Sequence, residues 1–425
     1  MKVRFGFWRI VLGLILASGL FATIVRFTRG LGASTNLSDQ FPWGIWIGFD
    51  ILCGVGLAAG GFTLTAAVHI FRIERFKSVV RPAVLTAFLG YLLVVFALFF
   101  DLGKPWNIWH PLVMWNPHSV MFEVAWCVML YTMVLGLEFS PMLWEKLGWT
   151  KVLRAVKQIT PVVVIMGVIL STLHQSSLGS LFLITPGKLH PLWYSPWLPV
   201  FFFLSSIAVG CSMVIFESFL SRRAFKHEID LPVLVDLGRV ALVALVLYAE
   251  LRFLDLQSRD ALRFIGFGTE EGRLFILEIA LGIAAPVLML AIPRIRKNPG
   301  GLFTASTLIV LGFVLNRLNV GITGLQASSG VRYFPSWMEL AVTISLVGAG
   351  FAIFGLAVRH LPVFAEEVHS ARASRPLATS TVVGDVPCQR VRWVWPGNSP
   401  VASASGSSSP SVGSDSFISA SKGRI

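Results

Sequence analysis

Ten separate apolar runs, each about 20 residues long, constrain this 425-residue chain more than any other feature. A helix of that length crosses the hydrocarbon core of a bilayer, where an open backbone N–H or C=O finds no partner. The runs therefore predict an all-α polytopic membrane protein with about ten transmembrane helices. We place the helices at 10–28, 44–71, 82–101, 118–139, 158–178, 197–220, 231–252, 272–292, 301–318 and 337–359.

Proline removes a backbone donor and clashes with the preceding turn, so we expect the helices to break at the prolines between the runs. These breaks are Arg81-Pro82, Asn116-Pro117, Thr160-Pro161, Pro196, Pro232, Asn298-Pro299 and Pro335. Lys2, Arg4 and Arg9 precede the first run, as basic residues do in a secretory signal. The run is long and has no convincing small-residue cleavage site, so we expect a retained helix.

The composition of the chain changes near residue 362. Residues 399–422 are mostly Ser, Ala, Gly and Pro, and such a segment cannot bury enough apolar surface to fold. We therefore expect a polytopic helical membrane domain over 1–361 and a disordered cytoplasmic tail over 362–425.

The formal net charge of +13 is high for a chain with 55% hydrophobic and 13% charged residues. The even-numbered loops each carry three or four Lys or Arg, and the odd-numbered loops carry fewer, apart from the loop after the seventh run. Lys and Arg accumulate on the cytoplasmic side of membrane proteins. We therefore expect both termini in the cytoplasm and no nucleic-acid partner. The odd-numbered loops then face the far side, which is the periplasm of a bacterium.

The cysteines and histidines bear on which cofactors the chain could hold. Its four cysteines form no CxxC pair, so they predict neither a metal site nor an iron–sulfur cluster within the chain. Haem ligation would use His118 and His174, which lie on different predicted helices near the far-side surface. A second pair at another depth, common in membrane cytochromes b, is missing from the sequence. We favour haem-free chemistry and keep haem as an alternative.

Several acids fall inside the predicted helices, where each charge costs at least ~2.5 kcal/mol and needs a reason. Those in the far-side half or at its boundary are Asp50, Asp101, Glu123, Glu250, Glu278 and Glu339. A carboxyl group that gains and loses a proton suits proton delivery to a redox carrier. Glu123, Asp50 and Glu278, one to two turns inside the membrane, are the strongest candidates. A paired or snorkelling structural carboxylate remains the alternative for each acid.

The far-side loops are rich in Trp, Asn, His and Pro. The clearest examples are 41–46, 101–111, 115–118 and 190–194. Tryptophan is common where membrane meets water, so an interfacial aromatic belt explains most of these residues. The same residues concentrated on one face also fit a docking surface for a partner protein, and both interpretations stay open.

Several irregular strings resemble the NrfD/polysulfide reductase (PsrC-like) family of quinone-reactive membrane subunits. More narrowly, they resemble its HybB-like branch, the Ni/Fe-hydrogenase "cytochrome b" subunits. The resemblance covers approximately residues 5–365, with the strings in the right order. They are Pro42–Asp50 with Gly54–Gly61, Asp101–Pro105, Asn116–Ser119 through Glu123, Arg317–Val320 and Tyr333–Glu339.

The resemblance implies a core of two four-helix bundles, no haem despite the branch's name, and a quinone pocket near the periplasmic face. It implies that electrons pass between a periplasmic, ferredoxin-like iron–sulfur subunit and menaquinone or ubiquinone. The catalytic subunit would be a hydrogenase, a multihaem cytochrome or a molybdopterin enzyme. Glu123 and Asp50 best match the family's proton-transferring acids. The quinone pocket or far-side face would include His118, Trp115, Asn116 and Asp101.

These expectations together describe a quinone-reactive subunit of a respiratory oxidoreductase complex in the bacterial inner membrane. Such a subunit is not a complete enzyme by itself. Two alternatives remain: a membrane electron carrier that holds haem b, and a secondary transporter, which would also need acids inside the membrane.

Overall fold

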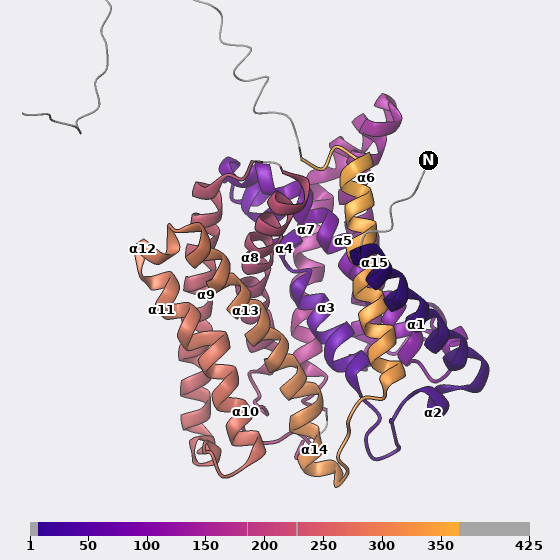
Figure 1. Cartoon of the computed structure of the whole chain (residues 1–425), viewed down its shortest axis with the longest axis vertical. Coiled ribbons are helices and arrows are strands. Elements are labelled where there is room, and N and C mark those ends of the chain that lie inside the picture. Colours follow the sequence, from indigo (N-terminus) through magenta and orange to yellow (C-terminus); the bar gives the residue numbers. More distant parts are fainter. Residues whose placement is uncertain (1–6, 185, 227, 365–425) are drawn as a thin grey trace, which may run out of the picture. The chain divides into compact units, whose positions relative to one another are not determined.

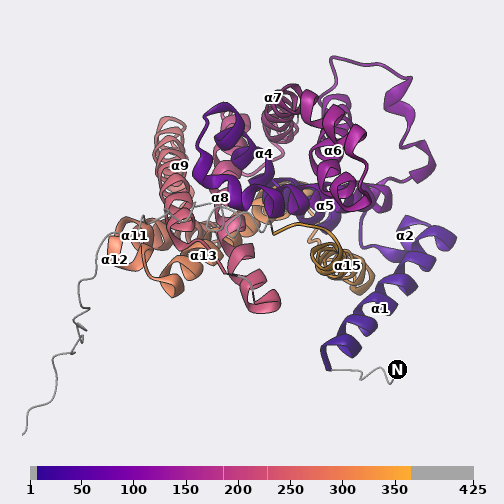
Figure 2. The same cartoon turned by 90° about the horizontal axis from the view of Figure 1, so that it is seen from above.

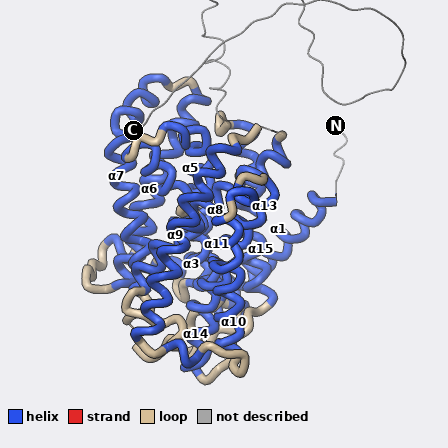
Figure 3. Tube along the Cα trace, turned by 90° about the vertical axis from the view of Figure 1, so that its left-hand side faces the viewer, coloured by secondary structure: helices blue, strands red, loops and turns tan. Residues whose placement is uncertain are grey.

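The computed structural model describes residues 7–184, 186–226 and 228–364. Every regular element in these residues is a helix (Figure 3). In these described residues, ten helical segments are long and apolar enough to cross a membrane, which confirms the expected number and indicates a multi-pass membrane protein (Figure 1). Their bounds are Phe7–Arg29, Trp46–Ile70, Glu74–Asp101, Val120–Leu147, Thr150–Ser180, Leu198–Phe225, Leu231–Ser258, Glu270–Ala291, Pro299–Ser329 and Trp337–His360.

Three spans contain π-helical turns, which are rare and often mark functional sites. The second span consists of the turn Trp46–Ile51, α3 (Leu52–Leu57), α4 (Gly60–Thr65) and the turn Ala66–Ile70. The eighth span consists of α10 (Glu270–Ile279), the turn Ala280–Ala284 and α11 (Ala285–Ala291). The ninth span consists of α13 (Pro299–Leu318), the turn Asn319–Thr323 and α14 (Gly324–Ser329). The other helices are α1 (Phe7–Arg29), α2 (Leu31–Ser34), α5 (Lys77–Asp101), α6 (Val120–Leu147), α7 (Thr150–Ser180), α8 (Leu198–Phe225), α9 (Leu231–Ser258), α12 (Pro293–Arg296) and α15 (Trp337–His360).

Two of the expected proline breaks are wrong. Pro82 lies inside α5 and Pro161 inside α7, so both helices begin earlier than predicted. Membrane helices tolerate proline because neighbouring helices and small backbone adjustments satisfy the carbonyl that loses its partner. The breaks at Pro232 and Asn298-Pro299 are confirmed, because α9 and α13 begin there.

The spans form two groups of four and one additional pair (Figure 2). The first group is the second span with α5, α6 and α7. The second group is α8 and α9 with the eighth span and α13. This grouping agrees with the two bundles that the family resemblance implied. The additional pair is α1 and α15, which pack on each other, and α15 also packs on α5.

Glycines allow the two groups to meet closely. A Cβ on Gly210 of α8 would lie 2.8 Å from the backbone of Ala59, and a Cβ on Gly60 would lie 2.9 Å from the Gly210 carbonyl oxygen. Small residues permit this kind of close helix approach in membranes. Glycines in the second span therefore serve close packing against α8.

The loops after the first, third, fifth, seventh and ninth spans lie at one end of the described helices, which we call the odd-loop end. The opposite end is the even-loop end; α14 marks the odd-loop end in Figure 1. At the expected domain boundary, Val363 is buried against side chains of α5 and α15. The rest of the expected tail, from residue 365, lies outside the described residues.

Candidate functional site

A groove of about 550 Å³ runs between the second span, α5, α8 and α15. This volume lies in the range of small-molecule sites, which are mostly apolar with a few polar groups. The groove fits that description, because leucine, phenylalanine, glycine and other apolar residues make up most of its wall. Its polar residues are Asp50, Thr86, Glu217, Ser221 and Arg223.

Asp50 lies in the π-helical turn Trp46–Ile51, near the odd-loop end of the groove. Its side chain is buried, and its Oδ2 accepts a 2.7 Å hydrogen bond from the Thr343 hydroxyl of α15. Among the described residues no hydrogen bond reaches Oδ1. One carboxylate oxygen thus fixes the side chain, and the other remains available to a molecule in the groove.

Asp101, the last residue of α5, lies close enough to Asp50 for their charges to interact. Its Oδ1 is buried and has no hydrogen-bond partner in the described part of the chain. Arg26 of α1 is the nearby cation; it donates to the carbonyl oxygens of Phe100 and Leu102 at 2.8 and 2.6 Å. The structure therefore places Asp101 within range of charge interaction with both Asp50 and Arg26.

Glu339 is also near the odd-loop end, but its oxygens are fully used. The Tyr333 hydroxyl donates to Oε1 at 2.5 Å, and the backbone N–H groups of Asn36 and Ser336 donate to Oε2 at 3.0 and 2.7 Å. Burial, and then the bond to Glu339, raise the pKa of the Tyr333 phenol above its usual range. Glu339 therefore ties the start of α15 to the loops rather than facing a ligand.

Glu123 occupies a different position from Asp50. It lies in the first turn of α6, its side chain is exposed, and its Oε1 accepts a 2.5 Å hydrogen bond from Ser177 of α7. It is not among the residues that line the groove. Glu123 and Asp50, which the sequence analysis paired, thus lie in separate surroundings.

Trp115, Asn116 and His118 lie in the exposed loop between α5 and α6, outside the groove. The Trp115 ring packs on Trp126 of α6, with ring centroids 5.0 Å apart. This loop also exposes Trp106, Trp109 and the run Leu112–Met114. The structure therefore brings the loop residues together with the first turns of α6, near Glu123.

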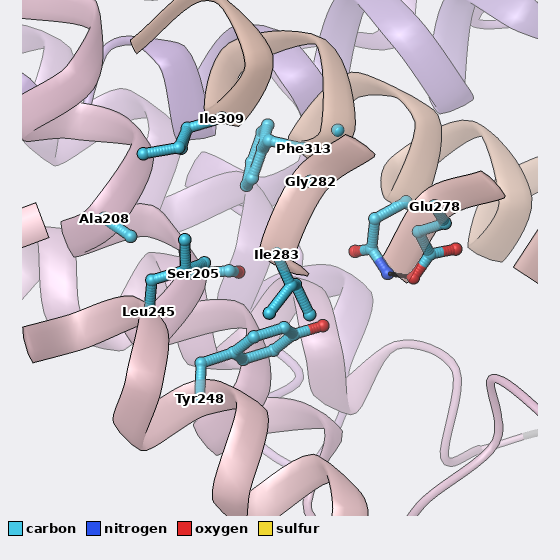
Figure 4. A pocket seen from close by; sticks show the side chains of 11 residues that line it. Ser205, Ala208, Leu245, Tyr248, Glu278, Gly282, Ile283, Ile309 and Phe313 are labelled. Carbon is cyan, nitrogen blue, oxygen red and sulfur yellow. Dashed lines mark hydrogen bonds between the residues drawn. The ribbon is translucent and has the colours of Figure 1, made fainter. Parts of the chain in front are cut away.

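Glu278 of α10, labelled in Figure 4, forms the centre of a buried network in the second group. The side chain of Asn316 donates to its Oε1 at 2.7 Å, and those of Asn319 and Trp193 donate to its Oε2 at 2.8 and 2.9 Å. Arg317 supplies the nearby positive charge and donates to the Asn316 side-chain oxygen at 2.6 Å. Three donors leave Glu278 little capacity to bind anything else.

A small cavity of about 30 Å³ adjoins this network, lined by Tyr248 and Glu278 among others (Figure 4). One water needs roughly 10–15 Å³ of such volume, so the cavity has room for water but not for a larger ligand. Arg317 is sandwiched between the rings of Phe202 and Phe313 at 3.6 and 4.3 Å. These contacts are typical of a structural network that joins helices.

His118 and His174, the two histidines considered as haem ligands, lie in different surroundings. His174 is fully buried, and its Nδ1 is 2.9 Å from the Tyr91 hydroxyl. His118 lies in the exposed loop instead. His174 Nε2 has no partner among the described residues, but a buried ring and an exposed loop ring do not fit the two sides of one haem.

At the even-loop end, Asp236 and Arg239, three residues apart on α9, form an ion pair at 2.6 Å, and Arg75 joins it at 2.6 Å. Sequence reasoning missed the hydroxyl partners of the acids: Thr343, Ser177 and Thr86. Serine and threonine are common in membrane helices, and no local pattern shows which of them meets an acid on another helix.

Comparisons with known proteins identify relatives along most of the chain. The family model described as "Polysulphide reductase, NrfD" matches residues 33–328. A Nitratidesulfovibrio vulgaris protein is 43% identical over 84% of this chain and 94% of its own length. The probable Ni/Fe-hydrogenase 2 b-type cytochrome subunit of Escherichia coli is 33% identical over 83% of this chain and 91% of its own. The menaquinone reductase, integral membrane subunit, of N. vulgaris is 28% identical over 87% and 94%.

Proposed function

The chain belongs to the polysulphide reductase NrfD family, and from this membership we propose that it is the quinone-reactive membrane subunit of a respiratory oxidoreductase complex. It passes electrons between a periplasmic iron–sulfur subunit and the quinone pool. The relative named as a menaquinone reductase membrane subunit supports a quinone as the exchangeable substrate. The observation that carries the proposal is an apolar groove that contains an incompletely bonded carboxylate, Asp50.

Reduction of a quinone to a quinol consumes two electrons and two protons. In this proposal the partner subunit supplies both electrons, and Asp50 donates the two protons in succession, being reprotonated between the two transfers. Thr343 holds one oxygen of Asp50, so the other stays directed at the substrate. Such positioned proton transfer contributes about 10²–10⁴-fold to a rate. Asp101, beside Asp50, is suited to return the proton from the odd-loop end.

Glu123 has a second role in the proposal. Its exposed carboxylate at the start of α6 exchanges protons at the membrane surface. The exposed aromatic loop with Trp115, Asn116 and His118 forms the docking face for the iron–sulfur subunit. The odd-loop end then faces the periplasm of a bacterial inner membrane, and both termini lie in the cytoplasm. A hydrogenase, a multihaem cytochrome or a molybdopterin enzyme would complete the complex.

One observation favours a second candidate function. The E. coli relative carries "b-type cytochrome" in its name, and His174 has one ring nitrogen without a partner. A haem b carrier would show absorption bands in reduced-minus-oxidised spectra of the purified full chain. Our proposal expects no such bands, and their appearance at one haem per chain would favour the second candidate.

To test the proposed function, Asp50 is replaced in the complete complex. The complex is reconstituted in nanodiscs with a menaquinone analogue, and quinone turnover is measured. We expect Asp50→Asn to lower quinone turnover about 10²-fold or more, because the amide cannot donate and recover a proton. The matched control is Glu138→Gln, which changes a carboxylate in α6 outside the groove. We expect this control to turn over like the unchanged protein.

Assembly is checked by the amount of partner subunit that copurifies with each variant. An assembled Asp50→Asn complex with normal turnover would contradict the role of Asp50. Glu123→Gln in the same assay tests the second carboxylate. If its turnover and its pH dependence both equal those of the unchanged complex, Glu123 has no part in proton exchange.

A further inference from the structure

The quinone groove contains a second carboxylate that the proposed function does not use. Glu217 of α8 and Thr86 of α5 line the groove with Asp50. The Thr86 hydroxyl donates a 2.6 Å hydrogen bond to Glu217 Oε2. Glu217 Oε1 is buried and has no hydrogen-bond partner in the described residues. The arrangement repeats that of Asp50 and Thr343: a carboxyl group fixed through one oxygen by a threonine from another helix.

We propose that Glu217 and Thr86 form a second binding position for a quinone headgroup in this groove. The inference rests on the proposed function and deepens it, because it adds a position that the quinone occupies before or after it reaches Asp50. A protonated Glu217 donates from its unpartnered oxygen to a quinone carbonyl. The quinone carbonyl thereby supplies the hydrogen-bond partner that Glu217 Oε1 lacks among the described residues.

The positions of the two acids in their spans separate the two binding positions. Asp50 is four residues from Trp46, about 6 Å of helix rise from the odd-loop end of the second span. Glu217 is eight residues from Phe225, about 12 Å from the even-loop end of α8. The headgroup at Glu217 thus lies in the opposite half of the membrane from Asp50, and the apolar wall between them accommodates the isoprenoid chain.

The chemistry of Glu217 distinguishes a quinone from a phospholipid. Acyl chains would fill the apolar wall equally well, but they offer no hydrogen-bonding group at the depth of Glu217. A buried polar atom without a partner is costly. A lipid would leave that cost in place, whereas a quinone carbonyl removes it. Arg223, also on the groove wall, would instead attract a lipid phosphate, so lipid occupancy is the outcome to test against.

The experiment uses the full chain in nanodiscs with a photoreactive azido-naphthoquinone that carries a short isoprenoid chain. After illumination, mass spectrometry locates the labelled residues. We expect label at two places, near Asp50 within 49–58 and near Glu217 within 213–221. Glu217→Leu should lower the second label roughly fivefold or more, because one hydrogen bond is lost. The first label should remain unchanged.

Two further measurements separate quinone binding at Glu217 from lipid binding there. Glu217→Gln retains a donor at the same place, so it should retain most of the second label. A phosphatidylglycerol with a photoreactive acyl chain should label residues 213–221 weakly in the unchanged protein. Equal quinone label in Glu217→Leu, or strong lipid label there, would overturn the second position. Absence of quinone label at both places would contradict the proposed function itself.

Discussion

Asp50 and Glu278 are both buried acids near the odd-loop end, in different groups of four spans, yet their surroundings differ. Asp50 accepts one hydrogen bond and faces a groove of about 550 Å³. Glu278 accepts three side-chain hydrogen bonds and adjoins a cavity of about 30 Å³. Burial alone therefore does not separate the two acids. They differ in unused hydrogen-bonding capacity and in the room for a ligand beside them.

The largest expected effect is on stability, at Glu278. Glu278→Ala leaves three buried donors without their acceptor and removes the carboxylate charge near Arg317. Removal of one partner from a buried charged network typically costs about 3–5 kcal/mol. Asp50→Ala loses one hydrogen bond, which costs about 1 kcal/mol. Thermal unfolding in detergent should therefore place the Glu278→Ala midpoint clearly below that of Asp50→Ala. Equal midpoints would remove the distinction between the two acids.

The second prediction compares packing beside Glu278 with packing on the wall of the groove. A Cβ on Gly312 of α13 would lie 2.0 Å from the Gly282 Cα, so Gly312→Ala must separate the eighth and ninth spans, at about 1–3 kcal/mol. A Cβ on Gly355, which lines the groove, would meet only Phe225 at 4.0 Å. We expect Gly355→Leu to keep the unfolding midpoint but to lower quinone turnover by filling the groove. Unchanged turnover in Gly355→Leu would show that quinone does not use this space.

Part of this arrangement was predictable from sequence because its signals are local. Ten apolar runs fix the number of spans, and Asp236 with Arg239 is a pair three residues apart on one helix. The distinction between Asp50 and Glu278 was not predictable. Both were selected by depth in the membrane, which is a property of one helix at a time.

What separates the two acids comes from remote residues. Thr343 is 293 residues from Asp50, and Trp193 is 85 residues from Glu278. Such contacts depend on how the helices pack, and no residue spacing encodes them. The same reason explains why Glu123 and Asp50, similar in depth, lie in separate surroundings.

The third prediction concerns the hydrogen bonds of the two acids. Thr343→Val keeps the side-chain volume but removes the bond to Asp50, which is worth about 1 kcal/mol and thus roughly a fivefold change. We expect quinone turnover in the complex to fall by about that factor. Asn319→Leu removes one donor from Glu278 and should lower the unfolding midpoint while turnover stays unchanged. The reverse result, with turnover affected only by Asn319→Leu, would assign the quinone chemistry to the Glu278 network.

The smallest expected effect is a pH dependence of the loop that supports Glu278. His190 lies outside the spans, and burial lowers its pKa below the ordinary 6.5, although Glu271 opposes the shift. Its Nδ1 accepts a hydrogen bond from the Leu192 N–H at 3.3 Å, which requires the neutral ring. The next residue, Trp193, donates to Glu278. The unfolded chain takes up this proton at higher pH than the folded one, so stability falls as the pH drops below about 6.5. His190→Asn keeps an acceptor that does not titrate, and we expect it to flatten the dependence of the unfolding midpoint between pH 8 and pH 5 by a small amount. If the unfolding midpoints of His190→Asn and of the unchanged protein depend on pH in the same way, protonation of His190 does not affect the stability of this loop.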